Sequence, residues 1–188
     1  GSLFILIVYL RYESLHCFAF RLVAYLSLFN CFDSMSQILP AHMINDSACI
    51  VQAVGIQFFG MCGILWTGSI CLILYFQVVK RVKNIKKYEK ILLLSTILLS
   101  TCTAVIPLFF DEMGYVGGNC WIENLKKGAV FRWAFFFIPA WVVIILISIT
   151  YFLIIRKVHE ESHLISGLDE ERRLIINKLR VYPIIMAC

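Results

Sequence analysis

Long runs of apolar residues alternate with short polar stretches along the chain. Four runs reach the length of roughly 20 helical residues that crosses a hydrocarbon core about 30 Å thick. They cover residues 18–39, 48–79, 91–110 and 129–155. The run over residues 3–10 is too short to span, and the run that opens at residue 174 reaches only to residue 188. The pattern predicts an all-α fold, a polytopic membrane helix bundle.

Composition supports a membrane protein and excludes several other classes. Of the 188 residues, 61% are hydrophobic and 15% are charged, whereas about a quarter are charged in a soluble domain. The mean hydropathy of +0.84, with only 4 prolines and 10 glycines, excludes disordered and collagen-like chains. We expect one bundle over residues 1–188, with a partial first helix, helices 2–5 and the start of helix 6. We expect the lipid bilayer as a partner and no nucleic acid.

Basic residues gather on one side of the predicted bundle. Positive residues mark the cytoplasmic side of membrane proteins. Those on this side include Lys80, Arg81, Lys83, Lys86, Lys87, Arg172, Arg173, Lys178 and Arg180. The loops over residues 40–47 and 111–128 are then extracellular, and the first helix enters from outside. Asn45 begins an Asn-Asp-Ser sequon in the first of these loops, so we expect it to carry a glycan.

Cysteine placement predicts one disulfide. Six of the eight cysteines lie within or at the ends of apolar segments, where a thiol is usually a reduced, small hydrophobic group. Only Cys49 and Cys120 lie at the outer boundary of the bundle. Because disulfides form in oxidising compartments, we expect these two to be bridged.

Polar groups within the apolar segments are candidates for function, because a charge in hydrocarbon is costly unless it faces a neighbour or a wet cavity. Asp33 lies three residues after Asn30, so both belong to one helix face, which we expect to point to the bundle interior. Whether they bind a ligand or only lock helices together is left open by the sequence. The candidates for an outward-facing ligand pocket are Asp33, Gln52, Gln57, Trp121, Arg132 and Trp133.

Two features of the helices concern packing. Gly55, Gly63, Thr67 and Cys71 form a small-residue stripe on one helix face, which permits close approach and marks this helix as the central one. Pro139 removes a backbone donor within the fifth helix and is expected to kink it.

One catalytic pattern is present. His159-Glu160-Glu161-Ser162-His163 matches the His-Glu-x-x-His template of zinc proteases. Polar residues flank it outside the bilayer, so we favour a solvated helical extension with no metal. A membrane-embedded zinc metalloprotease stays an alternative, as does a transporter, although no internal repeats are evident. No phosphate-binding loop or Cys-x-x-Cys pair occurs, so we expect no cofactor and no enzyme.

Several short motifs resemble one receptor family. They are Phe20 to Ser27, Cys49 to Gln52, Trp66-Thr67, Leu74-Tyr75, Gly118 to Ile122, Phe137-Ile138-Pro139 with Trp141, Lys178-Leu179 and Tyr182-Pro183. Together they resemble seven-helix G-protein-coupled receptors, most closely the slime-mould cyclic-AMP-receptor-like family. Secretin- and adhesion-type receptors share the Cys-Trp pair, and the Asp-Arg-Tyr pattern of rhodopsin-like receptors is missing.

The resemblance implies a fragment of a seven-transmembrane receptor in the plasma membrane. Such a receptor binds an extracellular ligand and signals to a heterotrimeric G protein through its inner loops. The basic residues named above would face that G protein. The positive-inside rule also explains these charges without any protein partner.

Overall fold

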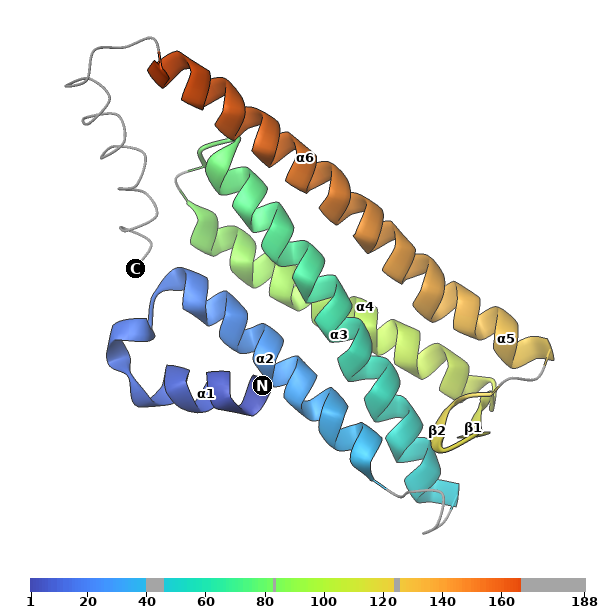
Figure 1. The fold of residues 1–188 in the computed structure, drawn as a ribbon. Coiled ribbons are helices and arrows are strands. Elements are labelled where there is room, and N and C mark those ends of the chain that lie inside the picture. Colours follow the sequence, from blue (N-terminus) through green and yellow to red (C-terminus); the bar gives the residue numbers. More distant parts are fainter. Residues whose placement is uncertain (40–45, 83, 124–125, 167–188) are drawn as a thin grey trace.

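The computed structural model of the protein describes residues 1–39, 46–82, 84–123 and 126–166. Figure 1 shows helices running beside one another, with a small hairpin at one end. The helices are α1 (Ser2–Arg11), α2 (Phe18–Ile38), α3 (Asp46–Val78), α4 (Ile85–Phe109), α5 (Lys126–Arg132) and α6 (Ile138–Ser166). A short 3-10 turn, Glu13–Leu15, joins α1 to α2, and a π-helical segment, Trp133–Phe137, joins α5 to α6. The predicted helical bundle is confirmed.

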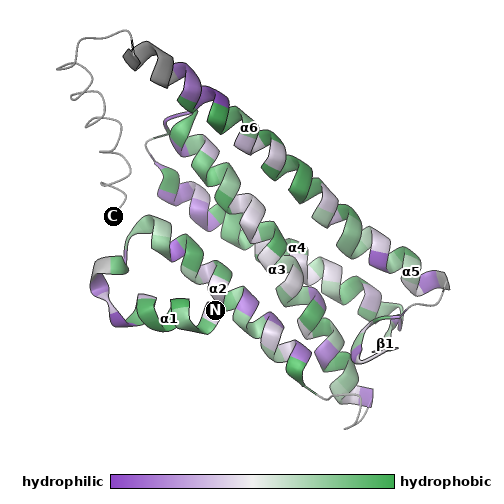
Figure 2. Cartoon of the chain, in the orientation of Figure 1, coloured by the Kyte–Doolittle hydropathy of each residue, from purple (hydrophilic) through white to green (hydrophobic). Residues whose placement is uncertain are grey.

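Three of the described helices are both long and apolar enough to cross a membrane: Asp46–Val78, Ile85–Phe109 and the continuous stretch Lys127–Glu160. The sequence predicts four such spans. Helix α2 has the length, 21 residues, but Arg21, Asn30 and Asp33 lower its hydropathy. Figure 2 shows α6 as mostly hydrophobic, and its Ile145 and Phe152 are 55% and 64% exposed. Such exposed apolar groups belong in lipid, so the protein is a multi-pass membrane protein.

Helix α3 is the central helix, as predicted, because it packs against α2, α4, α6 and both strands of the hairpin. Its Trp66 is completely buried, and the indole Nε1 donates to the carbonyl of Leu22 at 2.9 Å. A Cβ atom on Gly55 would lie 2.7 Å from Ser36 Oγ, and one on Gly63 would lie 3.0 Å from Asn30 Oδ1. The glycines therefore let α2 approach α3 closely.

The loop between α4 and α5 contains a hairpin that the sequence analysis did not predict. Strands β1 (Met113–Val116) and β2 (Asn119–Ile122) pair in antiparallel fashion. Gly117 and Gly118 form the turn with φ of +56° and +139°, a conformation that glycine adopts easily. The predicted disulfide is confirmed: it joins Cys49 in α3 to Cys120 in β2, with Cα atoms 5.3 Å apart.

The connection between α3 and α4 is shorter than predicted. The predicted apolar runs end at residue 79 and begin again at residue 91, which leaves residues 80–90 as a connection, but α4 begins at Ile85. Its first turns include Lys86 and Lys87, which are exposed, and Glu89, which is buried. The earlier start of α4 has a physical reason. The Glu89 carboxylate accepts two hydrogen bonds from Arg21, which tie the first turns of α4 to α2.

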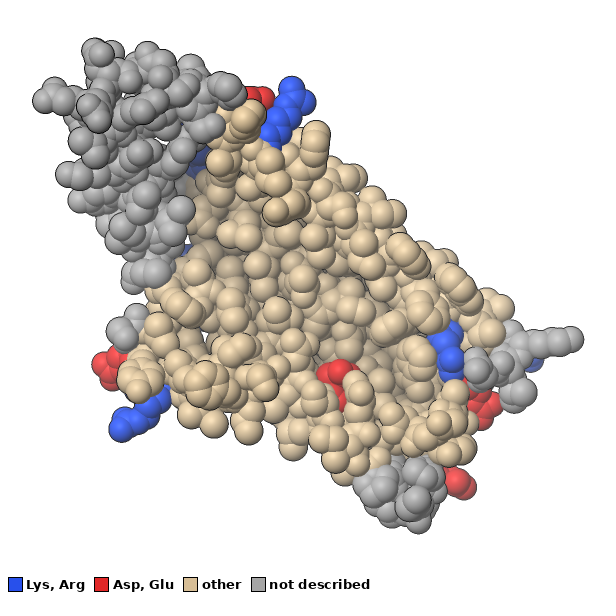
Figure 3. Space-filling model, viewed as in Figure 1, with Lys and Arg blue, Asp and Glu red and all other residues tan. Residues whose placement is uncertain are grey.

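The bundle has two ends, to which we give fixed names. The hairpin end holds β1, β2 and the start of α3, and the basic end holds the α3–α4 connection with Lys80, Arg81, Lys86 and Lys87 (Figure 1). In Figure 3 the charged side chains on the viewed face gather toward the ends, with an acidic exception between them. Several predicted residues lie outside the described ones: Asn45, Lys83, Arg172, Arg173, Lys178, Arg180, and the side chain of His163.

Candidate functional site

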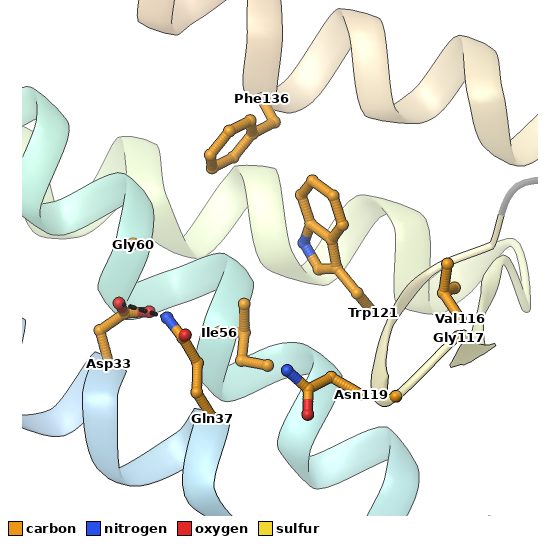
Figure 4. Close-up of a pocket in the computed structure, with 10 residues that line it drawn as sticks. Asp33, Gln37, Ile56, Gly60, Val116, Gly117, Asn119, Trp121 and Phe136 are labelled. Atoms are coloured by element: carbon orange, nitrogen blue, oxygen red, sulfur yellow. Dashed lines mark hydrogen bonds between the residues drawn. The ribbon is translucent and has the colours of Figure 1, made fainter.

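A cavity of about 470 Å³ opens at the hairpin end, between α2, α3, the hairpin and the π-helical segment (Figure 4). Its volume is in the range of small-molecule sites. The lining residues are Asp33, Gln37, Ile56, Gly60, Val116, Gly117, Gly118, Asn119, Trp121 and Phe136. Segments that lie about 100 residues apart in the chain therefore meet at one site.

Asp33 supplies the charge of this cavity. It is the single ionisable group among the described lining residues, and it is only partly buried. Its Oδ2 accepts a hydrogen bond of 2.8 Å from Gln37 Nε2, one helical turn further along α2. Gly60 of α3 lies next to this carboxylate: a Cβ atom on it would lie 3.5 Å from Asp33 Oδ1 and 4.0 Å from Phe136 Cε2. Gly60 therefore borders both the carboxylate and an aromatic ring.

Two aromatic rings form the opposite wall. Trp121 of β2 and Phe136 of the π-helical segment meet edge to face, with centroids 5.2 Å apart. The guanidinium carbon of Arg132 lies 4.5 Å from the Trp121 ring centroid, and Arg132 Nη2 donates to the carbonyl of Ile122. Arg132 is not among the lining residues, so its contacts hold the tryptophan and the hairpin in position.

Gln57 connects the aromatic wall to the π-helical segment Trp133–Phe137, which interrupts the long helix formed by α5 and α6. Its Oε1 accepts a hydrogen bond of 2.9 Å from Trp121 Nε1, and its Nε2 donates to the carbonyl of Phe135 at 3.0 Å. In a regular helix, that carbonyl would accept from the backbone N–H of residue 139. Pro139 has no N–H to donate. The Gln57 side chain therefore supplies a donor where the proline cannot.

Gln52 ties the hairpin to the end of α2. Its Nε2 donates to the carbonyls of Ser36 at 3.0 Å and Leu39 at 2.7 Å, and its Oε1 accepts from the backbone N–H of Cys120 at 3.1 Å. Gln52 is 1% exposed and Gln57 is fully buried. Both amides hold the walls of the cavity from behind.

The structure brings some of the predicted pocket residues together and separates others. Asp33 and Trp121 line the cavity, and Gln52, Gln57 and Arg132 support its walls. Trp133 is 56% exposed and lies outside the lining. Sequence reasoning missed Gln37 and Phe136. The spacing of Gln37 four residues after Asp33 was a usable signal, whereas Phe136 stands in a run of aromatic residues that offered none.

The basic end carries an ion pair that the sequence analysis also missed. Arg21 donates from Nε to Glu89 Oε1 at 2.7 Å and from Nη2 to Oε2 at 2.5 Å. The side chain of Glu89 is 6% exposed and that of Arg21 is 35% exposed. This bidentate pair fixes α2 to the start of α4.

The His-Glu-x-x-His stretch lies on the last turns of α6. His159 and Glu160 are exposed, and the Glu160 carboxylate lies 3.3 Å from Arg156 and 3.6 Å from Lys157. Among the described residues, no three His, Cys, Asp or Glu side chains cluster in a way that could hold a metal ion. The described geometry gives the protease alternative no support.

The chain is similar in sequence to known receptor proteins. "G-protein coupled receptor 1" of Arabidopsis thaliana is 28% identical over 194 residues, which covers 99% of this chain and 59% of the relative. "Cyclic AMP receptor-like protein A" of Dictyostelium discoideum is 26% identical over 164 residues, 87% of this chain and 43% of the relative. The chain thus spans about half the length of the curated relatives it matches.

The fold has a solved counterpart. Squid rhodopsin superposes with a TM-score of 0.73 at 17% sequence identity, covering 89% of this chain and 50% of that chain. The likeness shows that the helices are arranged as in part of the squid rhodopsin bundle. Residues 1–185 match the protein family described as "Slime mold cyclic AMP receptor". The predicted resemblance is confirmed, and the chain belongs to the slime mold cyclic AMP receptor family.

Proposed function

We propose that this protein is a plasma-membrane receptor that binds an extracellular ligand in the cavity at the hairpin end. It then activates a heterotrimeric G protein through its basic end. The receptor family and fold imply a protein that is not an enzyme. None of the relatives described above is a protease or a transporter.

The observation that carries this proposal is the contact chain from Trp121 through Gln57 to Phe135. Trp121 lines the cavity, and the Phe135 carbonyl belongs to the π-helical segment, whose next residue, Phe136, also lines it. π-Helical turns inside long helices are often found at functional sites. A ligand that moves these rings would act on a helix that continues to Ser166, toward the basic end (Figure 1). Ligand binding can thereby favour one of two bundle states.

Three features support an extracellular hairpin end. A disulfide lies there, which fits an oxidising compartment. The basic residues lie at the other end, which fits the cytoplasm. The sequon at Asn45 immediately precedes α3. In this orientation α1 begins outside, and the loops before α3 and after α4 are extracellular.

Charge reversal at the basic end tests the coupling. Lys86 and Lys87 are exposed in the first turn of α4, where a partner's acidic groups can reach them. In the full-length protein, Lys86→Glu with Lys87→Glu should reduce receptor-stimulated nucleotide exchange on the G protein at least about tenfold, while surface expression and topology stay normal. The matched control is Lys127→Glu, an exposed lysine at the hairpin end, which should leave exchange within about twofold. Unchanged exchange in the double variant would leave the lysines with a topological role only.

A further inference from the structure

The first turns of α4 carry the exposed lysines of the basic end and also the buried end of an ion pair. We infer that Arg21 and Glu89 are positioning residues for coupling. Their ion pair fixes the start of α4, so that Lys86 and Lys87 are presented to the G protein in one arrangement. The inference rests on the proposed function for the identity of the partner. The need for an anchor follows from the chemistry of α4 itself.

The first turn of α4 is a poor helix start by its local chemistry. Its N-cap residue, Asn84, makes no side-chain hydrogen bond to the free N–H groups, and the turn contains no acidic residue. Lys86 and Lys87 instead place two positive charges near the positive end of the helix dipole. A helix start without local support depends on contacts with the rest of the protein.

Glu89 supplies such a contact on the side of α2. Its side chain is 6% exposed, and both carboxylate oxygens accept hydrogen bonds from Arg21. Arg21 is itself held by the core, because its guanidinium carbon lies 5.7 Å from the Phe18 ring centroid. The carbonyl of the next residue, Leu22, accepts from Trp66 of α3. Phe18, Leu22 and Trp66 all belong to one buried cluster, so the pair ties α4 to the best-packed part of the bundle.

The other contacts of this turn restrain its orientation less. The ring centroids of Tyr88 and Phe76 of α3 lie 5.5 Å apart, and Tyr88 is 40% exposed. Ile85 packs against the buried cluster, but hydrophobic contact is not directional. A bidentate arginine–carboxylate pair, in contrast, allows only a narrow range of geometries. The ion pair is therefore the contact that fixes how the turn is rotated.

Position explains this pair better than stability does. Two charges lose water when they are buried, and apolar residues of similar size are often as stable. Lys86 lies three residues before Glu89 and hence on the same face of the helix. A turn that rotates or frays would therefore move Lys86 together with Glu89. The expected signature is a variant that keeps its stability and loses its coupling.

Hydrogen exchange tests the anchoring of α4 without any partner. In an α-helix the amides of residues 89–92 bond to the carbonyls of residues 85–88, so they report on the first turn. In the full-length protein in lipid nanodiscs, Arg21→Leu with Glu89→Leu should make these amides exchange at least about tenfold faster. The amides of residues 99–103 should change by less than about twofold, and the denaturant midpoint should stay near that of the parent.

Two further variants separate the ion pair from a general effect of mutation. Arg21→Glu with Glu89→Arg restores the pair in the opposite sense and keeps the charge of the basic end. It should bring exchange at residues 89–92 to within about threefold of the parent. Arg156→Leu with Glu160→Leu removes an exposed ion pair of α6 and should leave the exchange at residues 89–92 unaltered.

Binding of the G protein tests the consequence for coupling. The probe is the purified heterotrimeric G protein, freed of nucleotide and added to the receptor in nanodiscs without any ligand. The double leucine variant should bind it at least about fivefold more weakly, and the charge-swapped variant should bind within about twofold of the parent. A purely structural role of the pair predicts normal binding by the double leucine variant, because that variant keeps its stability.

Three outcomes would overturn the inference: unchanged exchange at residues 89–92 in the double leucine variant, normal G-protein binding by that variant, or a charge-swapped variant no better than it. Glu89→Gln carries the same comparisons if the double leucine variant does not reach the cell surface, because it removes one charge and keeps the shape. A parent protein that binds no G protein would refute the proposed function, whereas the exchange rates would still decide whether the pair anchors α4. Equal binding by the parent and the double leucine variant would refute this inference alone.

Discussion

At the scale of single residues, Arg21 and Glu89 have the strongest charge contact in the described bundle. The pair is bidentate, with distances of 2.7 and 2.5 Å, and it links α2 to α4 at the basic end. Removing one partner of a buried ion pair costs more than the pair itself contributes, because the other charge is left without compensation. The partly exposed Arg21 can regain water, which reduces that cost.

Glu89→Gln should therefore lower the free energy of unfolding by about 1–3 kcal/mol. Denaturant titration in detergent micelles measures this value. The control is Glu160→Gln, which removes an exposed helical ion pair and should cost no more than about 0.5 kcal/mol. The double variant Arg21→Leu with Glu89→Leu should recover most of the loss, because no buried charge remains. Equal losses of unfolding free energy in Glu89→Gln and Glu160→Gln would show that the buried ion pair contributes no more to stability than an exposed one.

One half of this pair is conspicuous in the sequence and the other is not. Arg21 is a charge within an apolar run, whereas Glu89 lies among lysines that are typical of a cytoplasmic loop. The pattern of residues 85–90 is polar and gives no helical stripe. These residues form the start of α4 in contact with α2, and a contact between segments 68 residues apart is not encoded in local periodicity.

At the scale of secondary structure, the joint between the π-helical segment and α6 connects cavity and helix. Gln57 donates to the Phe135 carbonyl, and Pro139 lacks the N–H that would otherwise address this carbonyl. The two residues lie on different helices, and both affect the Phe135 carbonyl: Gln57 donates to it, and Pro139 withholds a donor from it. Their effects on stability should therefore depend on each other.

A double-mutant cycle tests this dependence. Gln57→Leu alone should cost about 1–3 kcal/mol of unfolding free energy, because it leaves the Trp121 N–H and the Phe135 carbonyl without their buried partner. In the Pro139→Ala background residue 139 regains a donor, so the same change should cost about 0.5–1.5 kcal/mol less. Gln52→Leu is the control, because none of its hydrogen-bond partners Ser36, Leu39 and Cys120 belongs to α6. Additive effects of Gln57→Leu and Pro139→Ala would show that the two positions do not act together on the Phe135 carbonyl.

Hydropathy predicted the elements far better than their irregularities. The apolar runs located α2, α3, α4 and the long helix, and the boundary cysteines located the disulfide, because both depend on short-range pattern or on a simple topology. Pro139 predicted a kink, but the π-helical segment before it could not be read from the aromatic run at residues 133–137. The hairpin was missed because each strand has only four residues, too few for an alternating pattern.

At the scale of the whole molecule, the two ends of the bundle differ in chemistry. The hairpin end has the disulfide, the cavity and the stacked Arg132, and the basic end has the exposed lysines of α4. Between them the long helix exposes apolar side chains such as Ile145. Of the cavity, the sequence predicted Asp33 and Trp121. The remaining lining could not be predicted, because it results from how α2, the hairpin and the π-helical segment pack around α3.

This polarity predicts the orientation of the chain in the membrane. Carrying several lysines across the bilayer is costly, so the basic end should remain in the cytoplasm. Lys127→Cys and Lys87→Cys replace exposed lysines at opposite ends. A membrane-impermeant maleimide should label the first in intact cells, and the second only after permeabilisation, above the parent protein's background. Asn45→Gln should abolish a glycosidase-sensitive shift in mobility, whereas Asp46→Ala, which keeps the sequon, should preserve it. Labelling of Lys87→Cys in intact cells would show that the orientation is the opposite of the one proposed. The cavity would then lie at the cytoplasmic face, where no extracellular ligand could reach it.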